Sequence, residues 1–167
     1  LAWHPAGTRT GDAEIDAVIA AVEQSAFVPQ SLIGWQRVAC RVPGAVQGLG
    51  GPPECPEGIA DETPIDVIPA ASCEGYWVQR PPGDEPVRLI VGREQRLYAV
   101  GKLDPAQQYP RGEHALIYVL PSRPEFGTAI YVTDGKIVAE WSGCATSPVE
   151  MLRDAASIVF PPPPPGG

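Results

Sequence analysis

The stretch TAIYVTDGKIVAEW, residues 128–141, decides the fold that this sequence predicts. Two runs rich in β-branched and aromatic residues flank Asp134-Gly135, a pair that favours a type I′ turn because both central residues take positive φ. We therefore expect an antiparallel hairpin. Side chains alternate along a strand, so Glu140 and Trp141 should face opposite sides of the sheet. If Trp141 faces the core, Glu140 points to solvent, whereas on a concave sheet Glu140 could line a pocket.

Further strand-like runs lie upstream of this hairpin. His114–Leu120 (HALIYVL) is continuously apolar, as a strand buried on both faces should be, and the histidine that opens it is expected to be structural. Residues 87–91 and 96–100 look like a second hairpin, connected through residues 92–95. Three shorter strands are expected at residues 35–42, 65–68 and 76–79.

Two helices are expected, one near each end of the chain. The first begins at Asp12, which can cap it, and runs to about Gln24 with one apolar stripe formed by Ile15, Val18, Ile19 and Val22. The second begins with Ser147-Pro148-Val149-Glu150, where serine and glutamate form a capping box and proline suits the first helical position. It should run to about Ser157, with an apolar face formed by Val149, Leu152, Ala155 and Ala156.

These elements predict an α+β fold, in which a mainly antiparallel curved sheet packs on the N-terminal helix and a C-terminal helix follows. Cystatin-like and NTF2-like folds have this architecture. We divide the chain into an extended N-terminal arm (residues 1–11), a single disulfide-stapled domain (12–160) and a polyproline tail (161–167).

The four cysteines, Cys40, Cys55, Cys73 and Cys144, show neither a CxxC pair nor zinc-ligand spacing, so two disulfides are expected and no metal site. Three pairings are possible. We favour Cys40 with Cys55, which closes a loop of about 15 residues and ties down the glycine- and proline-rich stretch 43–64, and Cys73 with Cys144, which ties the last hairpin to the middle of the chain.

The runs GLGGPPECPEG (residues 48–58) and TPIDVIPAASCEG (63–75) resemble those of a group of small exported proteins from thermophilic filamentous green bacteria. The resemblance extends over about residues 12–145 and includes the early helix IDAVIAAV, the strand LYAV and the late hairpin VTDGKIV. It implies export and disulfide bonding, but no activity and no catalytic residues. The helix after Cys144 and the proline tail depart from the pattern of the group.

Composition narrows the classes of partner. The net charge is −8, and the two lysines and ten arginines form no cluster, which argues against nucleic acid and anionic membranes as partners. No apolar run is long enough to span a membrane. The chain begins at Leu1, as expected of an exported protein whose signal peptide has been removed. It contains no asparagine and 21 prolines, which is typical of heat-adapted proteins but also of GC-rich genomes.

No catalytic motif is present: the GxSxG, HExxH, P-loop and EF-hand patterns are all missing. The neighbouring carboxylates Glu54 and Glu57, and Asp61 and Glu62, lie in the glycine- and proline-rich stretch and are expected to be solvated. We therefore expect no enzymatic activity, no cofactor and no metal.

The ends of the chain are the remaining candidates for function. An aromatic arm and a polyproline rod can both contact other proteins, because a proline rod docks at low entropic cost. We expect contacts between subunits, in an oligomer or filament, from Trp3, His4, Pro5, Phe160, Pro161, Pro162, Pro163, Pro164 and Pro165. The sequence thus favours an extracellular structural protein that associates with itself. A small-ligand-binding module with an NTF2-like pocket is the alternative, and an enzyme on that fold is the least favoured.

Overall fold

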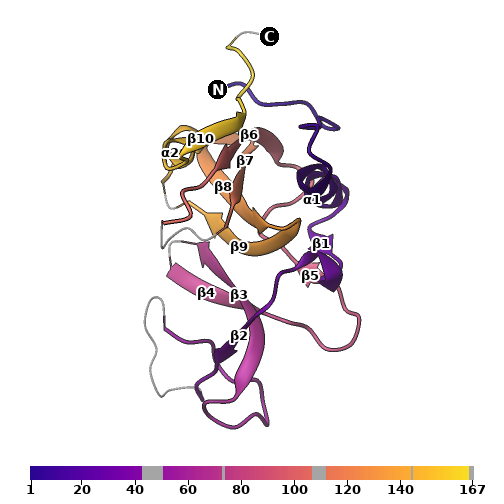
Figure 1. Ribbon diagram of the computed structural model, residues 1–167, viewed down its shortest axis with the longest axis vertical. Helices are drawn as coiled ribbons and strands as arrows, with labels where there is room; N and C mark the ends of the chain where they lie inside the picture. The colour runs from indigo at the N-terminus through magenta and orange to yellow at the C-terminus, as the bar shows by residue number, and fades with distance from the viewer. Residues whose placement is uncertain (43–50, 73, 107–111, 144, 166–167) are drawn as a thin grey trace.

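The protein consists of one large sheet, two helices and, at one pole, a lobe that carries the Cys40–Cys55 disulfide; Figure 1 shows it with its long axis vertical. The computed structural model describes residues 1–42, 51–72, 74–106, 112–143 and 145–165. The helices are α1 (Ala13–Gln24) and α2 (Pro148–Arg153), with a short 3₁₀ turn η1 (Gln30–Leu32). The strands are β1 (Phe27–Val28), β2 (Gln36–Ala39), β3 (Pro64–Ser72), β4 (Glu74–Gln79), β5 (Val87–Arg88), β6 (Arg96–Lys102), β7 (His114–Leu120), β8 (Arg123–Thr133), β9 (Lys136–Ser142) and β10 (Ser157–Phe160).

The large sheet has eight strands in the order β10-β6-β7-β8-β9-β3-β2, with β4 paired to the other edge of β3. All neighbours are antiparallel except β3 and β9, which run parallel over only three residue pairs, Ala70–Ser72 against Glu140–Ser142. The hairpin expected at residues 128–141 is confirmed as β8 and β9, and Asp134 and Gly135 both take positive φ in its turn. The α+β class is confirmed as well.

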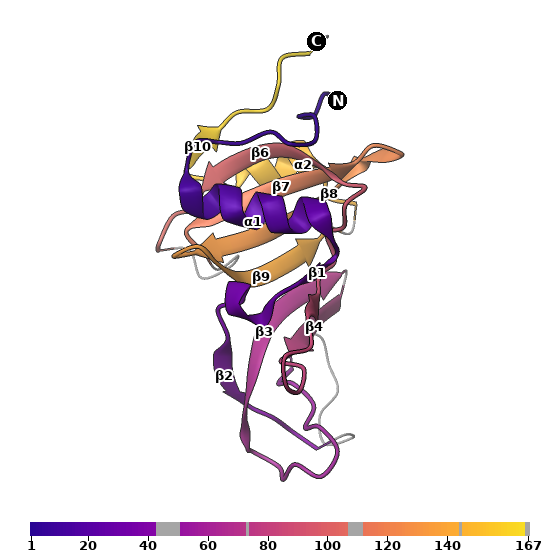
Figure 2. The same cartoon turned by 90° about the vertical axis from the view of Figure 1, so that its right-hand side faces the viewer.

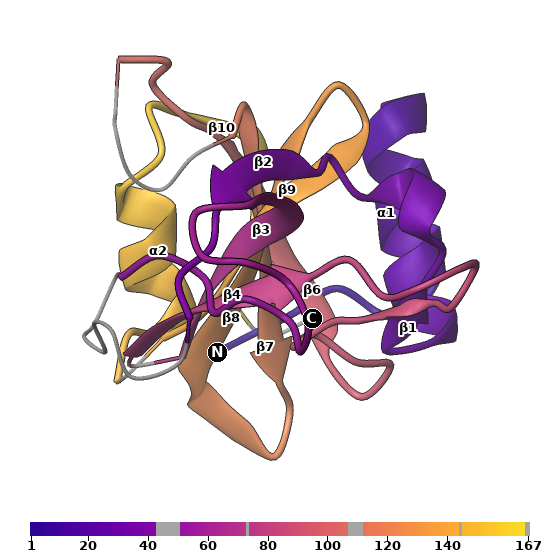
Figure 3. The same cartoon turned by 90° about the horizontal axis from the view of Figure 1, so that it is seen from below.

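Two hydrophobic cores lie on opposite faces of this sheet, because α1 covers one face and α2 the other (Figure 3). Helix α1 crosses the sheet (Figure 2) with the expected stripe of Ile15, Val18, Ile19 and Val22 buried against it, and Asp12 caps its N-terminus. On the other face, Met151 of α2 packs with Tyr98 and Ile117. Cover on both faces explains why β7 is apolar throughout rather than alternating.

The expected hairpin between residues 87–91 and 96–100 is wrong. Strand β5 pairs instead with β1, in register Phe27 with Arg88 and Val28 with Val87, as a separate two-stranded sheet. The two edges of β6 are occupied by β7 and β10. Residues 89–95 therefore cross from the small sheet to the large one, and we name this crossing segment the strap.

The second helix is shorter than expected. It keeps the predicted capping box of Ser147 and Glu150 but ends at Arg153, and residues 157–160 form β10, which the sequence did not predict. The β-branched pair Ile158 and Val159 favours a strand. The buried residues of α2 are Pro148 and Met151, whereas Val149, expected on the apolar face of this helix, is 38% exposed.

Candidate functional site

The two ends of the chain meet at one pole of the molecule, above the edge of the sheet formed by β6 and β10 (Figures 1 and 2). After α2, the Ala156 amide donates to the Lys102 carbonyl at 2.9 Å, which starts β10 along the outer edge of β6. The arm continues the same edge, since the His4 amide donates to the Leu97 carbonyl at 2.8 Å. We call residues 1–5 and 157–165 together the terminal pole.

His4 joins the arm to the tail. Its Nε2 lies 2.9 Å from the carbonyl oxygen of Pro161, and because a carbonyl only accepts, the ring must donate from that nitrogen. The same ring lies against Phe160, with ring centroids 4.6 Å apart. The first residues of the chain and the start of the polyproline tail are therefore held to each other by one histidine.

A hollow of about 740 Å³ opens on the terminal pole. It is lined by Leu1, Ala2 and Trp3 of the arm, by Tyr98 of β6 and by three prolines of the tail. Beside it, the edge strand β10 leaves Ile158 and Val159 exposed by 54% and 44%, and Leu1 is exposed by 54%. Exposed apolar residues on an edge strand are the usual mark of a surface that pairs with another chain.

Seven of the nine predicted contact residues are thus brought together by the hollow or by the contacts of His4; Pro5 and Pro164 are not among them. Pro5 is exposed and uses its carbonyl to accept from the Thr8 hydroxyl at 2.8 Å, so it shapes the arm and does not line the hollow. The arm is also tied to α1, since the Asp16 carboxylate accepts from the amide and hydroxyl of Thr10. Contacts with a second subunit remain a prediction.

A second candidate surface lies along the strap. Two shallow cavities of about 500 and 330 Å³ share Gln95 and Leu120 in their walls. The side chain of Gln95 accepts from the Gly92 amide at 2.8 Å and donates to the Thr128 hydroxyl at 3.0 Å. We call this surface the strap groove. The sequence indicated neither Gln95 nor Thr128 as a site residue, because the hydrogen bond that pairs them is not local.

Glu140 lies under the strap, so the first of the two alternatives given for it, exposure to solvent, is wrong. It is 1% exposed, because the face of β9 opposite Trp141 is also covered. Its Oε1 accepts from the Ile90 amide at 2.9 Å, and its Oε2 has no hydrogen-bond partner among the described residues. Burial raises the pKa of Glu140 to about 7, although the hydrogen bond from Ile90 acts in the opposite direction.

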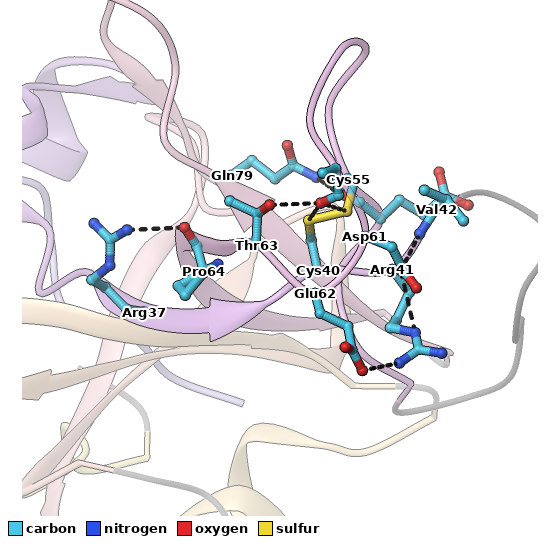
Figure 4. The surroundings of a disulfide bond; sticks show 12 residues. Arg37, Cys40, Arg41, Val42, Cys55, Asp61, Glu62, Thr63, Pro64 and Gln79 are labelled. Carbon is cyan, nitrogen blue, oxygen red and sulfur yellow. Dashed lines mark hydrogen bonds and ion pairs between the residues drawn. A yellow bond between two sulfur atoms is a disulfide. The ribbon is translucent and has the colours of Figure 1, made fainter.

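The lobe at the other pole carries the Cys40–Cys55 disulfide, which confirms the first of the two favoured pairings (Figure 4). Asp61 and Glu62, expected to be solvated, form exposed ion pairs with Arg41 at 3.4 and 2.9 Å, and Glu57 is exposed. Asp61 and Glu62 thus hold Arg41 and Val42 to the loop that precedes β3. Cys73 and Cys144 lie outside the described residues, so the second pairing is untested.

Within the ranges that the structure describes, no three metal-ligating side chains come together, and no helix is long and apolar enough to cross a membrane. Comparisons of the chain with family models, with curated proteins and with solved structures find no match. Function must therefore be argued from these surfaces alone.

Proposed function

We propose that this chain is a non-enzymatic extracellular structural protein that associates with further copies of itself through the terminal pole. The observation that carries the proposal is the apolar surface that both termini build together: the hollow beside Trp3 and the edge strand with Ile158 and Val159. A surface of this kind is more often an interaction site than an accident of folding.

The distribution of charge supports a second copy as the occupant. The protein carries a net charge of −8, so two copies repel each other overall. Residues 1–8 and 155–167, however, contain no charged side chain. The terminal pole is thus a place where two copies can approach without bringing acidic side chains together.

The geometry of the tail limits the form of this contact. Prolines have no amide hydrogen, so residues 161–165 cannot extend the hydrogen-bond ladder that ends in β10. Recognition would therefore combine the short edge of residues 157–160 with apolar packing in the hollow. If the partner surface lies at the other pole, the contact is heterologous and builds an open filament; if it is the same pole, it builds a dimer.

Three further expectations belong to the same proposal. The Cys40–Cys55 disulfide supports an oxidising, extracellular location, since such bonds are rare in the cytosol. We also propose a cystatin-like or NTF2-like arrangement and a relation to the group of exported bacterial proteins named above. The position of α1 across the large sheet supports the first of these two.

Light scattering on the native protein tests self-association. We expect an assembly well above 17.7 kDa that becomes monomeric when Ile158 and Val159 are both replaced by lysine, because each exposed apolar contact is replaced by a charge. Phe27→Lys is the matched control: Phe27 is 52% exposed but lies on β1, away from the terminal pole, and its replacement should leave the assembly intact. A wild-type protein that is monomeric at high concentration contradicts the proposal.

A small-ligand-binding module is the second candidate, and the strap groove is the observation that favours it. Its cavities have the volume of typical small-molecule sites, and the buried Thr128 lines the smaller one. Ile90, which lines the larger one, donates its amide to the buried Glu140. A monomer whose melting temperature rises with small amphipathic solutes, and no longer does so in Thr128→Val, would favour this function over the first.

A further inference from the structure

The strap is held to the large sheet by two side chains. At its start, the Leu89 amide donates to the Ala26 carbonyl at 2.7 Å, which fixes it to the small sheet. The Ile90 amide then donates to Glu140, and Gln95 at the far end donates to Thr128. Among the residues that the structure describes, the strap is therefore hydrogen-bonded to the large sheet at two side chains, Glu140 of β9 and Thr128 of β8.

The other neighbours of Glu140 belong to firmly paired strands. In the register of the sheet, Glu140 stands between Ile130 of β8 and Ala70 of β3, and both strands have partners on each side. The strap lacks such a ladder and is kept in place by the apolar side chains Leu89 and Val91, which are buried. Among the surroundings of Glu140, the strap is the wall that can move at the smallest cost.

We propose that Glu140 is a proton-operated latch for the strap: with the carboxyl neutral the strap lies closed on the sheet, and loss of the proton to solvent loosens residues 89–95 and opens the strap groove. This inference is independent of the proposed self-association, since the strap and the terminal pole share no residue.

The strap should open on deprotonation because the charged carboxylate of Glu140 needs hydration far more than the neutral carboxyl does. The neutral carboxyl accepts one hydrogen bond from Ile90 and is stable in apolar surroundings. The carboxylate brings a full charge into the same place, where its Oε2 has no partner among the described residues. One N–H donor does not replace a hydration shell, so the charged form favours any motion that admits water, and the strap is the movable wall.

Few other charges bear on this group. Tyr76 of β4 stands in the same row across the strands as Ala70 and Glu140. Burial, together with the Glu140 carboxylate, raises the pKa of Tyr76, so its phenol stays neutral over the pH range in which Glu140 titrates. Arg88 of β5 and Arg93 and Glu94 of the strap are exposed to solvent. The strands on either side of Glu140 place Ile130 and Ala70 next to it, which do not titrate. Because burial raises the pKa of Glu140 to about 7, the opening of the strap should be complete near neutral pH.

Hydrogen exchange tests the latch. In wild-type protein, protection of residues 87–96, corrected for the intrinsic exchange rate at each pH, should fall by about tenfold or more between pH 5.5 and pH 8.5. At pH 8.5 it should lie well below the protection of β7, which exchanges only when the whole domain unfolds. Glu140→Gln keeps an acceptor for Ile90 but cannot ionise, so its strap should stay protected at both pH values. Glu94→Gln is the matched control, because it removes an exposed carboxylate of the strap and should keep the wild-type response.

The wild-type measurement decides the matter even if Glu140→Gln does not fold. Equal protection of the strap at the two pH values overturns the proposal. So does a strap that is as well protected as β7 at pH 8.5, which would mean that the strap exchanges only when the whole domain unfolds and that no latch exists. A pH response that persists unchanged in folded Glu140→Gln would assign it to another group and also overturn the proposal.

Discussion

At the scale of single residues, Glu140 is the clearest case of a side chain whose surroundings set its chemistry. A strand that faced solvent on one side would leave this carboxyl ionised and hydrated, and the alternation with Trp141 suggested such a strand. The sequence correctly put the two side chains on opposite faces. It did not indicate that both faces are covered, because the strap that covers Glu140 comes from residues 89–95, some 50 positions earlier.

The raised pKa of Glu140 has a consequence for global stability with a definite sign. Its folded-state pKa of about 7 lies above the ordinary value of 4.5, so the folded protein binds this proton more tightly than the unfolded chain does. The free energy of unfolding should therefore fall as pH rises from about 4.5 through 7, by roughly 3 kcal/mol in total, and then level off.

Glu140→Gln removes this dependence. We expect urea unfolding to give the variant and the wild type similar free energies of unfolding at pH 5, and to give the variant the larger value at pH 8.5. Glu94→Gln, which replaces an exposed carboxylate, should follow the wild type at both pH values. A wild type that stays as stable as Glu140→Gln at pH 8.5 would show that the buried carboxyl is accommodated at no cost in its charged form.

At the scale of elements, local signals were sufficient for α1 and for the hairpin of β8 and β9. The helix has its cap and its apolar stripe within 13 consecutive residues, and the hairpin has its turn between two strands that pair with each other. Strands β1, β5 and β10 find their partners far along the chain instead. The pairing of Phe27 with Arg88 and of Ile158 with Gly101 depends on which edges are free after the larger sheet has formed, and no window of sequence contains that information.

Gly101 of β6 makes room for the turn between α2 and β10. A Cβ at this position would lie 2.5 Å from the Cβ of Ala155, closer than two carbons can approach. Gly101→Ala should therefore push the C-terminal segment off β6 and lower the free energy of unfolding by about 1–3 kcal/mol. Chemical denaturation measures this loss.

Two further variants identify the cause. Gly92→Ala is the control, because its added carbon would meet only the Cβ of Ala26 at 3.8 Å, an ordinary contact. Combining Gly101→Ala with Ala155→Gly removes the clash and should restore part of the lost stability. If the double variant is as unstable as the sum of the two single changes, close packing between these positions is not the reason for the glycine.

At the scale of the whole molecule, the large sheet consists of two halves joined by a short seam. Strands β6 to β10 form one half with α1 and α2, and β2, β3 and β4 form the other half with the disulfide lobe (Figure 2). The halves meet where β3 and β9 pair over three residues, and where the Gly34 amide donates to the Ile137 carbonyl at 2.8 Å. Such a seam gives few hydrogen bonds to resist a hinge between the two halves.

A covalent bond at this seam would hold the halves together, and the sequence predicts one. Ser72 and Ser142 pair directly across β3 and β9, and Cys73 and Cys144 follow them by one and two positions. We expect peptide mapping without reduction to recover a Cys73–Cys144 bond, whereas free thiols at both positions would contradict this.

In the chain-entropy model, closing a loop of about 70 residues contributes roughly 4 kcal/mol, against about 3 kcal/mol for a loop of some 15 residues. Replacing Cys73 and Cys144 by serine should therefore cost at least as much stability as replacing Cys40 and Cys55. It should also speed hydrogen exchange in β3 and β4, because no disulfide then joins the two halves of the sheet.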